Sequence, residues 1–261
     1  MNTDLLNATL VDRHDLSQEL AVIRVQLDRG STLSFEPGQY TTIGLPQPLG
    51  VSVKRPKLLQ RAYSIASSPD QHDHLEFYVV LVPNGQLTPR LWNVDVGGRL
   101  WIGQKAKGHF TLERVPRNKD LVMIGTGTGL APYMSMLRAY RGQDRWRRFV
   151  VIHGVRLAQD CGYRHELEQA AAQDPTVVYI PTVTREPEDS SWRGMRGRVQ
   201  TVLEEATYQR LVGAPLVCDR CHVFLCGHGD MIHTVQTMLE AKGFSVATSR
   251  TPGNLHVERY W

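Results

Sequence analysis

Apolar positions recur with different periodicities in the two parts of this 261-residue chain. In the first part they alternate with polar positions, as in residues 23–28, which read Ile-Arg-Val-Gln-Leu-Asp, and in residues 75–81. This period of two is typical of strands with one buried face. Clusters of turn-forming residues separate such segments, at residues 36–38, 67–70 and 83–85. Short strands at this spacing predict an antiparallel barrel or sandwich.

After residue 120 the chain alternates apolar runs of strand length with segments of helical period. The apolar, often β-branched runs cover residues 121–124, 149–155, 177–183 and 222–225. The helical pattern covers residues 132–141, 163–172, 199–208 and 230–242. Strands that alternate with helices predict a parallel sheet covered on both faces. We therefore expect a β-barrel over residues 1–117, followed by an α/β domain over residues 118–261.

The composition is that of an ordinary globular protein, with 41% hydrophobic and 21% charged residues. No apolar run approaches the ~18 residues that a membrane span needs, and the N-terminus shows no charged-then-apolar leader. We expect a soluble, cytoplasmic protein without a membrane partner. The formal net charge of the chain is +4, and the basic residues are spread along the sequence rather than gathered in one block. This spread argues against nucleic-acid binding.

The four cysteines are too few and too clustered for the disulfide framework of a secreted protein. The spacing Cys218-x-x-Cys221-x4-Cys226 admits a zinc site, but tetrahedral zinc needs a fourth ligand. Cys161 or His222 could supply one only through long-range folding. We therefore expect no metal, and we assign no role to the Cys218/Cys221 pair.

The strongest local signal is the glycine-rich segment of residues 125–132, Gly-Thr-Gly-Thr-Gly-Leu-Ala-Pro, which follows an apolar strand and opens a helix. Glycines let the backbone approach a phosphate closely, and the free N–H groups at the helix start attract the anion. Pro132 suits a first helical turn because its missing N–H loses nothing there. The spacing differs from the G-x-G-x-x-G fingerprint, so a simple tight turn is the alternative. The strand–loop–helix context favours phosphate binding.

Three arginines fall near the expected carboxyl ends of strands, where α/β sheets bind ligands: Arg156, Arg185 and Arg198. Arginine suits the extra phosphate of NADP, whereas NAD sites usually offer a carboxylate to the ribose. Each arginine alone also fits a solvated surface charge, and Glu186 is an alternative ion-pair partner. Together they favour NADP over NAD.

In the first part of the chain, the strand-like segment Arg61-Ala62-Tyr63-Ser64 could hold a flavin. Its arginine would bind the pyrophosphate, its tyrosine would stack on the ring, and its serine would hydrogen-bond near the reactive nitrogen. The alternative is a strand with one buried ring. The turn Gly85-Gln86-Leu87-Thr88 leads into a helix-like start, whose amides could bind the same pyrophosphate.

These segments, together with Phe35-x-Pro37-Gly38-Gln39-Tyr40, resemble the FAD-binding elements of the ferredoxin–NADP reductase family. Residues 125–132 resemble its NADP pyrophosphate loop, and Cys226-Gly227 resembles its nicotinamide-side motif. The ending Glu258-Arg259-Tyr260-Trp261 resembles that of the bacterial ferredoxin/flavodoxin–NADP reductases. The elements appear in family order and cover the chain almost end to end.

The resemblance implies a six-stranded antiparallel barrel that binds FAD and a parallel-sheet domain that binds NADP(H). It implies that Tyr63, Ser64 and Cys226 are catalytic, as positioning groups more than as acids or bases. Glu258 is not assigned as a proton donor on position alone. The implied cofactor-binding residues are Arg61, Ala62, Tyr63, Ser64, Gly85, Gln86, Leu87, Thr88, Gly125, Thr126, Gly127, Thr128, Gly129, Arg156, Arg185, Arg198, Gly227, Asp230, Tyr260 and Trp261.

The resemblance also implies a monomeric oxidoreductase whose partner is a small acidic ferredoxin or flavodoxin. Lys54, Arg55 and Lys57 are the basic residues expected to meet that partner. One alternative is a reductase component of an oxygenase, or a free flavin reductase. Another is an electron-transfer subunit of a larger flavin and iron–sulfur system, for which the clustered cysteines are relevant. A non-catalytic nucleotide-binding module is the alternative from another class.

Overall fold

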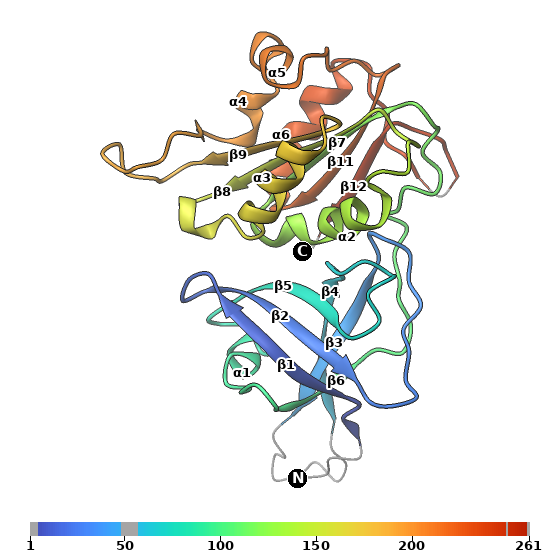
Figure 1. Ribbon diagram of the computed structural model, residues 1–261, viewed down its shortest axis with the longest axis vertical. Helices are drawn as coiled ribbons and strands as arrows, with labels where there is room; N and C mark the ends of the chain where they lie inside the picture. Colours follow the sequence, from blue (N-terminus) through green and yellow to red (C-terminus); the bar gives the residue numbers. More distant parts are fainter. Residues whose placement is uncertain (1–4, 48–56, 249, 260–261) are drawn as a thin grey trace. The chain divides into compact units, whose positions relative to one another are not determined.

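The computed structural model describes residues 5–47, 57–248 and 250–259 (Figure 1). The chain divides into two compact units. The first unit is Met1–Thr111 together with Met134–Ala139, and the second is Leu112–Tyr133 together with Tyr140–Trp261. A short stretch of one helix therefore packs with the first unit, although most of the chain around it belongs to the second.

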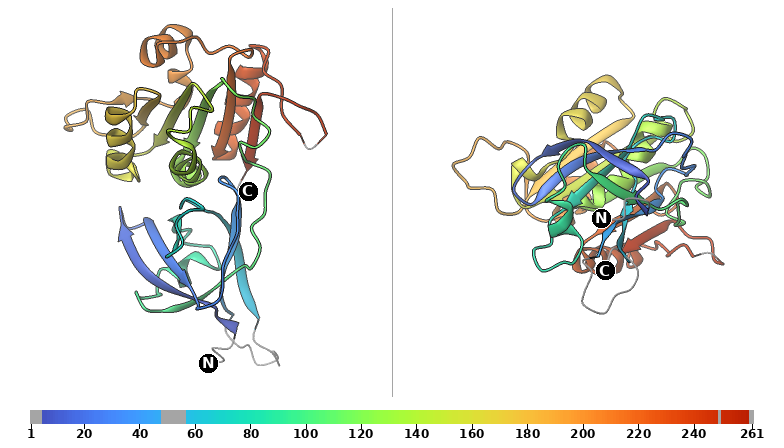
Figure 2. Two further views of the ribbon diagram at one scale, coloured as in Figure 1. Left: turned by 45° about the vertical axis from the view of Figure 1, so that its right-hand side comes forward. Right: turned by 90° about the horizontal axis from the view of Figure 1, so that it is seen from below.

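The first unit is an antiparallel barrel of six strands, which confirms the expected architecture (Figures 1 and 2). Its strands are β1 (Ala8–Asp15), β2 (Leu20–Leu27), β3 (Tyr40–Pro46), β4 (Leu58–Ser64), β5 (Leu75–Val80) and β6 (Arg99–Ile102). The hydrogen-bonded order is β4-β3-β6-β1-β2-β5, and every pair is antiparallel. The end strands β4 and β5 contact each other, so the sheet curls around its core. The short helix α1 (Thr88–Leu91) follows β5.

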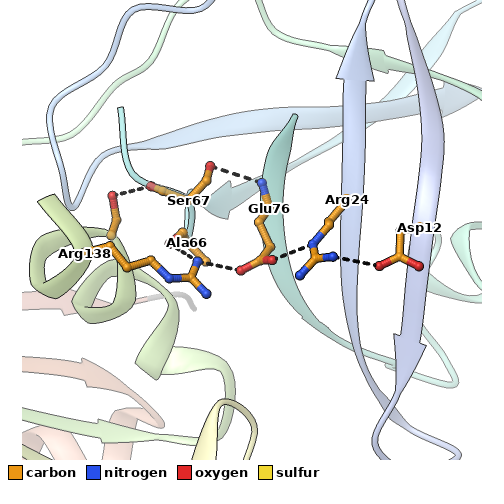
Figure 3. A network of polar contacts seen from close by, with 7 residues as sticks. Asp12, Arg24, Ala66, Ser67, Glu76 and Arg138 are labelled. Atoms are coloured by element: carbon orange, nitrogen blue, oxygen red, sulfur yellow. Dashed lines mark hydrogen bonds and ion pairs between the residues drawn. The ribbon is translucent and has the colours of Figure 1, made fainter. Parts of the chain in front are cut away.

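The predicted alternation holds in β2 but not in β5. In β2, Ile23 and Val25 are buried while Arg24 is exposed. In β5 both faces are covered, and Glu76 is only 2% exposed. A carboxylate tolerates such burial when positive groups surround it, and Arg24 and Arg138 both contact Glu76 (Figure 3).

The second unit is a parallel sheet of six strands, again as expected. Its strands are β7 (Asp120–Thr126), β8 (Arg148–Val155), β9 (Val177–Val183), β10 (Met195–Arg196), β11 (Cys221–Gly227) and β12 (Leu255–Arg259). The order is β10-β9-β8-β7-β11-β12. The helices are α2 (Ala131–Tyr140), α3 (Arg164–Gln173), α4 (Val199–Val202), α5 (Glu205–Val212) and α6 (Gly229–Glu240). Among the described residues, none of these helices is long and apolar enough to cross a membrane.

The single helix predicted over residues 199–208 is wrong, because the chain forms two helices there. Glu204 has extended backbone angles (φ −60°, ψ 133°) and separates α4 from α5. The break lets each helix turn its own apolar face to one core: Val199 and Val202 from α4, Tyr208 and Val212 from α5. Local periodicity does not reveal this break, because a continuous helix would carry a similar pattern.

The strand order reverses next to β7. From β7 the chain adds β8, β9 and β10 on one side, and then places β11 and β12 on the other. Such a switch point opens a crevice at the carboxyl ends of the strands, where open α/β sheets bind ligands. The residues at these ends are Gly125 of β7 and Cys226 of β11, which are register partners.

Candidate cofactor sites

The loops that follow β7 and β11 pack backbone against backbone. A Cβ added to Gly129 would overlap the carbonyl group of Cys226, and one added to Gly227 would overlap Thr126. Gly227 also has a φ of +133°, which L residues with side chains rarely adopt. Two of the glycines in the predicted motifs are therefore required by contact between the loops, whether or not a phosphate approaches them.

Thr126 joins the same two loops through its side chain. Its Oγ1 accepts a hydrogen bond from the backbone N–H of His228 at 2.9 Å. His228 in turn caps α6, because its Nδ1 accepts the N–H of Asp230 at 3.2 Å. The Asp230 carboxylate is exposed at the first turn of this helix. Of the two residues expected in the NADP site, Gly227 thus contacts the glycine-rich loop directly, and Asp230 is linked to it through His228.

His153 supports the glycine-rich loop and was missed by the sequence reasoning. Its side chain is fully buried on β8, and its Nε2 lies 3.0 Å from the carbonyl oxygen of Gly127. Burial lowers the pKa of His153 to about 4, so the ring is neutral at physiological pH. Since a carbonyl only accepts, the ring proton is placed on Nε2. A lone histidine inside the apolar run of residues 149–155 was the available signal.

Arg156, Arg185 and Arg198 follow three adjacent strands, β8, β9 and β10. The backbone N–H of Arg185 donates to the carbonyl of Arg156 at 2.8 Å, which fixes the first two strand ends side by side. All three arginines are exposed. Within the described part of the chain, none of their guanidinium groups has a hydrogen-bond or ion-pair partner. The structure thus places three positive charges at adjacent strand ends, and no carboxylate of the described residues pairs with them.

Glu186 is held elsewhere, although it is close in sequence. Its Oε2 accepts the backbone N–H of Ala158 at 2.6 Å. The neighbouring Arg196 donates to the carbonyl oxygens of Glu186 and Pro187 at 2.6 and 2.9 Å. The alternative in which Glu186 pairs with one of the three arginines is therefore not found. A dianionic phosphate suits the resulting arrangement better than a ribose hydroxyl does.

Cys226 and Glu258 lie opposite each other at the ends of β11 and β12. Cys226 is fully buried, and its thiol donates to Oε2 of Glu258 at 3.9 Å. The parallel pairing of β12 with β11 therefore carries the C-terminal segment back to the switch point. Tyr260 and Trp261, which follow β12, lie outside the described residues.

The other cysteines face protein groups rather than one another. The thiol of Cys221 donates to the carbonyl oxygen of Pro215 and that of Cys218 to Asp219, each at 3.8 Å. Burial raises the pKa of Cys221 to about 11, so this thiol stays protonated. Among the described residues, no group of three or more His, Cys, Asp or Glu side chains is placed to hold a metal ion. The zinc and iron–sulfur alternatives gain no support from this geometry.

In the barrel, Arg61 and Tyr63 stand on one face of β4, while Ser64 is buried at its end. Arg61 is exposed, and among the described residues its guanidinium donates only to the neighbouring Gln60 carbonyl, at 2.8 Å. The half-buried ring of Tyr63 meets Phe77 edge-on, with 6.5 Å between centroids. Burial raises the pKa of the Tyr63 phenol to about 12, so the ring is uncharged. A strand with an exposed guanidinium and a neutral ring on one face fits a flavin nucleotide.

The turn before α1 presents a row of amides. The Thr88 side chain links the two ends of this turn, because its Oγ1 accepts a hydrogen bond from the N–H of Val82 at 2.9 Å and donates one to the Val82 carbonyl at 3.2 Å. The backbone N–H groups of Gln86, Leu87 and Thr88 have no acceptor among the described residues. Unpaired consecutive amides are suited to binding phosphate oxygens. The Thr88 hydroxyl is engaged within the turn, whereas the three amides are available to an anion.

Both parts of the chain are similar to known domain families. The oxidoreductase FAD-binding domain model matches residues 7–111, and the oxidoreductase NAD-binding domain model matches residues 123–237. The flavodoxin/ferredoxin–NADP reductase of Escherichia coli (strain K12) is 34% identical over 230 residues, which cover 88% of this chain and 89% of the relative. The chain belongs to the ferredoxin–NADP reductase family.

Other members of the ferredoxin–NADP reductase family agree with this assignment. Ferredoxin–NADP reductase A of Sorangium cellulosum is 32% identical and covers 96% of this chain and 88% of its own. Among solved structures, the ferredoxin NADP⁺ reductase of Neisseria gonorrhoeae, with bound FAD and NADP, shares the fold. Its TM-score is 0.85 at 22% identity, with 98% of each chain covered. This flavoenzyme family membership confirms the fold class and the FAD and NAD(P) cofactors expected from sequence.

Proposed function

We propose that this reductase moves electrons between NADPH and a one-electron carrier, ferredoxin or flavodoxin, by way of bound FAD. The observation that carries the proposal is the set of three unpaired arginines at adjacent strand ends, Arg156, Arg185 and Arg198. Relatives named flavodoxin/ferredoxin–NADP reductases support the choice of carrier. When bound, FAD supplies the conversion between two-electron and one-electron transfer, while the protein supplies binding, orientation and electrostatics.

In the barrel, four groups hold and orient the flavin nucleotide. The Arg61 guanidinium and the amides of residues 86–88 bind the pyrophosphate, because both offer unpaired donors. Tyr63 stacks its neutral ring on the isoalloxazine. Ser64, at the end of β4, hydrogen-bonds near the flavin nitrogen that exchanges hydride.

In the α/β domain, the glycine-rich loop and the arginines bind the two ends of NADP. The amides of Gly127 and Thr128, at the start of the short 3₁₀ helix Gly127–Leu130, receive the pyrophosphate, since the first N–H groups of a helix have no intrahelical acceptor. The three arginines receive the 2′-phosphate. Cys226 lies beside the nicotinamide, and Glu258 fixes the orientation of its thiol. Tyr260 and Trp261 cover the flavin or its adenine.

The electron partner is acidic and binds transiently to a monomeric, cytoplasmic reductase. Lys57 is exposed at the start of β4, and the neighbouring Lys54 and Arg55 lie outside the described residues. Steering between opposite charges raises the association rate and weakens with salt. We expect the rate of ferredoxin or flavodoxin reduction to fall as ionic strength rises. A rate that is independent of salt contradicts this mode of docking.

The second candidate, a reductase component of a larger system, is less well supported. The cytochrome P450 reductase of Amycolatopsis shares the fold, with a TM-score of 0.74 at 25% identity. The Escherichia coli relative is more similar in sequence, at 34% identity, and is named a flavodoxin/ferredoxin–NADP reductase. Iron content and native mass of the purified protein distinguish the two candidates.

The first experiment is to record the visible spectrum of the purified protein and to add NADPH or NADH without oxygen. A flavin band that bleaches faster with NADPH supports the proposal. Equal rates, or a preference for NADH, contradict the role of the three arginines. A colourless protein that stays so after FAD is added contradicts the barrel assignment.

A further inference from the structure

The hydrogen bond between His153 and Gly127 fixes one peptide group of the glycine-rich loop. The carbonyl of Gly127 belongs to the peptide that also carries the N–H of Thr128. In a planar trans peptide the C=O and N–H point in opposite directions. Because buried His153 holds the carbonyl at 3.0 Å, the Thr128 N–H points away from the core. Thr128 itself is partly exposed, so this side of the loop is open to a ligand.

Gly127 needs such support because its own conformation does not select one peptide orientation. Its φ is +52°, and a Cβ there would meet nothing within 4 Å. Glycine populates positive and negative φ about equally, so the loop alone would sample several arrangements. The neighbouring glycines differ, because Gly125 and Gly129 have close contacts with other parts of the chain. The loop is thus packed at both ends, and at Gly127, where the short 3₁₀ helix Gly127–Leu130 begins, His153 supplies a side-chain hydrogen bond.

We infer that His153 is a positioning residue for nucleotide binding, which presets the Gly127–Thr128 peptide so that its N–H meets the pyrophosphate of NADP. The inference rests on the proposed role of the glycine-rich loop. The imidazole does not touch the nucleotide; it acts through the loop backbone. Its neutral state keeps the Nε2 proton available as a donor across the physiological pH range. Tyr179, whose hydroxyl lies 3.5 Å from Nδ1, faces the other ring nitrogen.

The function of a donor can be separated from that of a packed side chain by two substitutions. His153→Gln keeps an N–H at about the position of Nε2, whereas His153→Leu fills similar space without a donor. The ligands are NADP⁺, which contains the pyrophosphate, and adenosine 2′-monophosphate, which contains only the arginine-binding end. Binding is measured by titration calorimetry on the FAD-loaded protein, so the readout does not depend on turnover.

The expected result is selective. His153→Leu weakens NADP⁺ binding about tenfold, the contribution of one well-placed hydrogen bond, and leaves adenosine 2′-monophosphate binding unchanged. His153→Gln restores most of the NADP⁺ affinity. Unchanged NADP⁺ binding in His153→Leu overturns the inference. So does equal weakening of both ligands, which would indicate a merely structural role, or a failure of His153→Gln to restore binding.

Two further measurements keep the test informative if His153→Leu folds poorly. In the wild-type protein, long-range ¹H–¹⁵N spectra should show the His153 proton on Nε2, and a proton on Nδ1 overturns the inference. Thr128→Asp places a negative charge on the loop and should weaken NADP⁺ at least about tenfold by repulsion. Unchanged NADP⁺ binding in Thr128→Asp contradicts the loop as the pyrophosphate site. Weakening there, without any effect in His153→Leu, contradicts only the role of His153.

Discussion

Arg138, which is partly exposed, forms an ion pair with the buried Glu76 in the first unit, with 2.6 Å between Nη1 and Oε1. The Nε atom of Arg24 binds the other carboxylate oxygen of Glu76 at 2.9 Å, and Nη1 of Arg24 binds the carboxylate of Asp12 (Figure 3). Arg138 also donates to the carbonyl of Ala66 at 3.0 Å. One carboxylate on β5 therefore ties residues 134–139 of α2 to the barrel.

Removing Arg138 should destabilise the protein more than removing a nearby surface arginine. Arg138→Ala leaves the Glu76 carboxylate buried with only Arg24 as partner, and we expect a loss of about 2–3 kcal/mol in unfolding free energy. The matched control is Arg141→Ala, just beyond the same helix, where the side chain is exposed and the expected change is within about 0.5 kcal/mol. Urea denaturation measures both. Equal changes in the two variants contradict a structural role for the ion pair.

The same carboxylate should make stability depend on pH in the acid range. Burial alone would raise the pKa of Glu76, but the charges and hydrogen bonds of Arg138 and Arg24 outweigh it and hold the pKa below the usual 4.5. The stabilisation is therefore fully present above pH 4.5 and is lost as the pH falls through the lowered value. The difference in unfolding free energy between wild type and Glu76→Gln should shrink over that range. A stability difference that stays constant from about pH 6 to about pH 3 contradicts the lowered pKa of Glu76.

Tyr63 should hold the flavin through its ring rather than its hydroxyl. Tyr63→Ala removes the stacking surface and should weaken FAD binding about tenfold, which lowers the flavin content of the purified protein. Tyr63→Phe keeps the ring and should retain FAD. The ratio of flavin to protein absorbance measures both. Unchanged FAD content and turnover in Tyr63→Ala would contradict the proposal that the Tyr63 ring stacks on the flavin.

The three unpaired arginines should determine the preference for NADPH. Alanine at Arg156, Arg185 or Arg198 should lower kcat/KM for NADPH roughly tenfold, as expected for a lost charge-assisted hydrogen bond, and leave kcat/KM for NADH nearly unchanged. Arg210→Ala removes the same charge from the exposed end of α5 and serves as the control. If Arg210→Ala lowers kcat/KM for NADPH as much as the three site variants do, the effect comes from the overall charge of the protein and not from the proposed site.

Gly129 should not tolerate even a methyl group. In Gly129→Ala the new Cβ would overlap the backbone of Cys226, which cannot move without disturbing β11, and we expect a loss of about 1–3 kcal/mol together with weaker NADP⁺ binding. Gly229→Ala, at the start of α6, has open space around it and should be neutral or slightly stabilising. Thermal unfolding and calorimetry check both variants. A stable Gly129→Ala would contradict the tight packing of the two loops.

Much of the architecture was predictable because burial leaves a local trace in the sequence. The run of residues 177–183 coincides with β9, and the helix expected over residues 132–141 differs from α2 by one residue at each end. The buried state of Glu76 was not predictable, since a glutamate between Leu75 and Phe77 is typical of an exposed strand face. It becomes tolerable only when Arg138, 62 positions away, supplies its charge.

Periodicity and short motifs are properties of neighbouring residues, so the two-part organisation, the glycine-rich loop and the family could be recognised from the chain alone. Which distant groups meet became visible only in the folded protein. There Arg156, Arg185 and Arg198 have no side-chain partner among the described residues, Glu186 binds Ala158, and His153 contacts Gly127. The physical reason is that pairing of parallel strands joins segments tens of residues apart, and no local pattern records the register in which their ends come together.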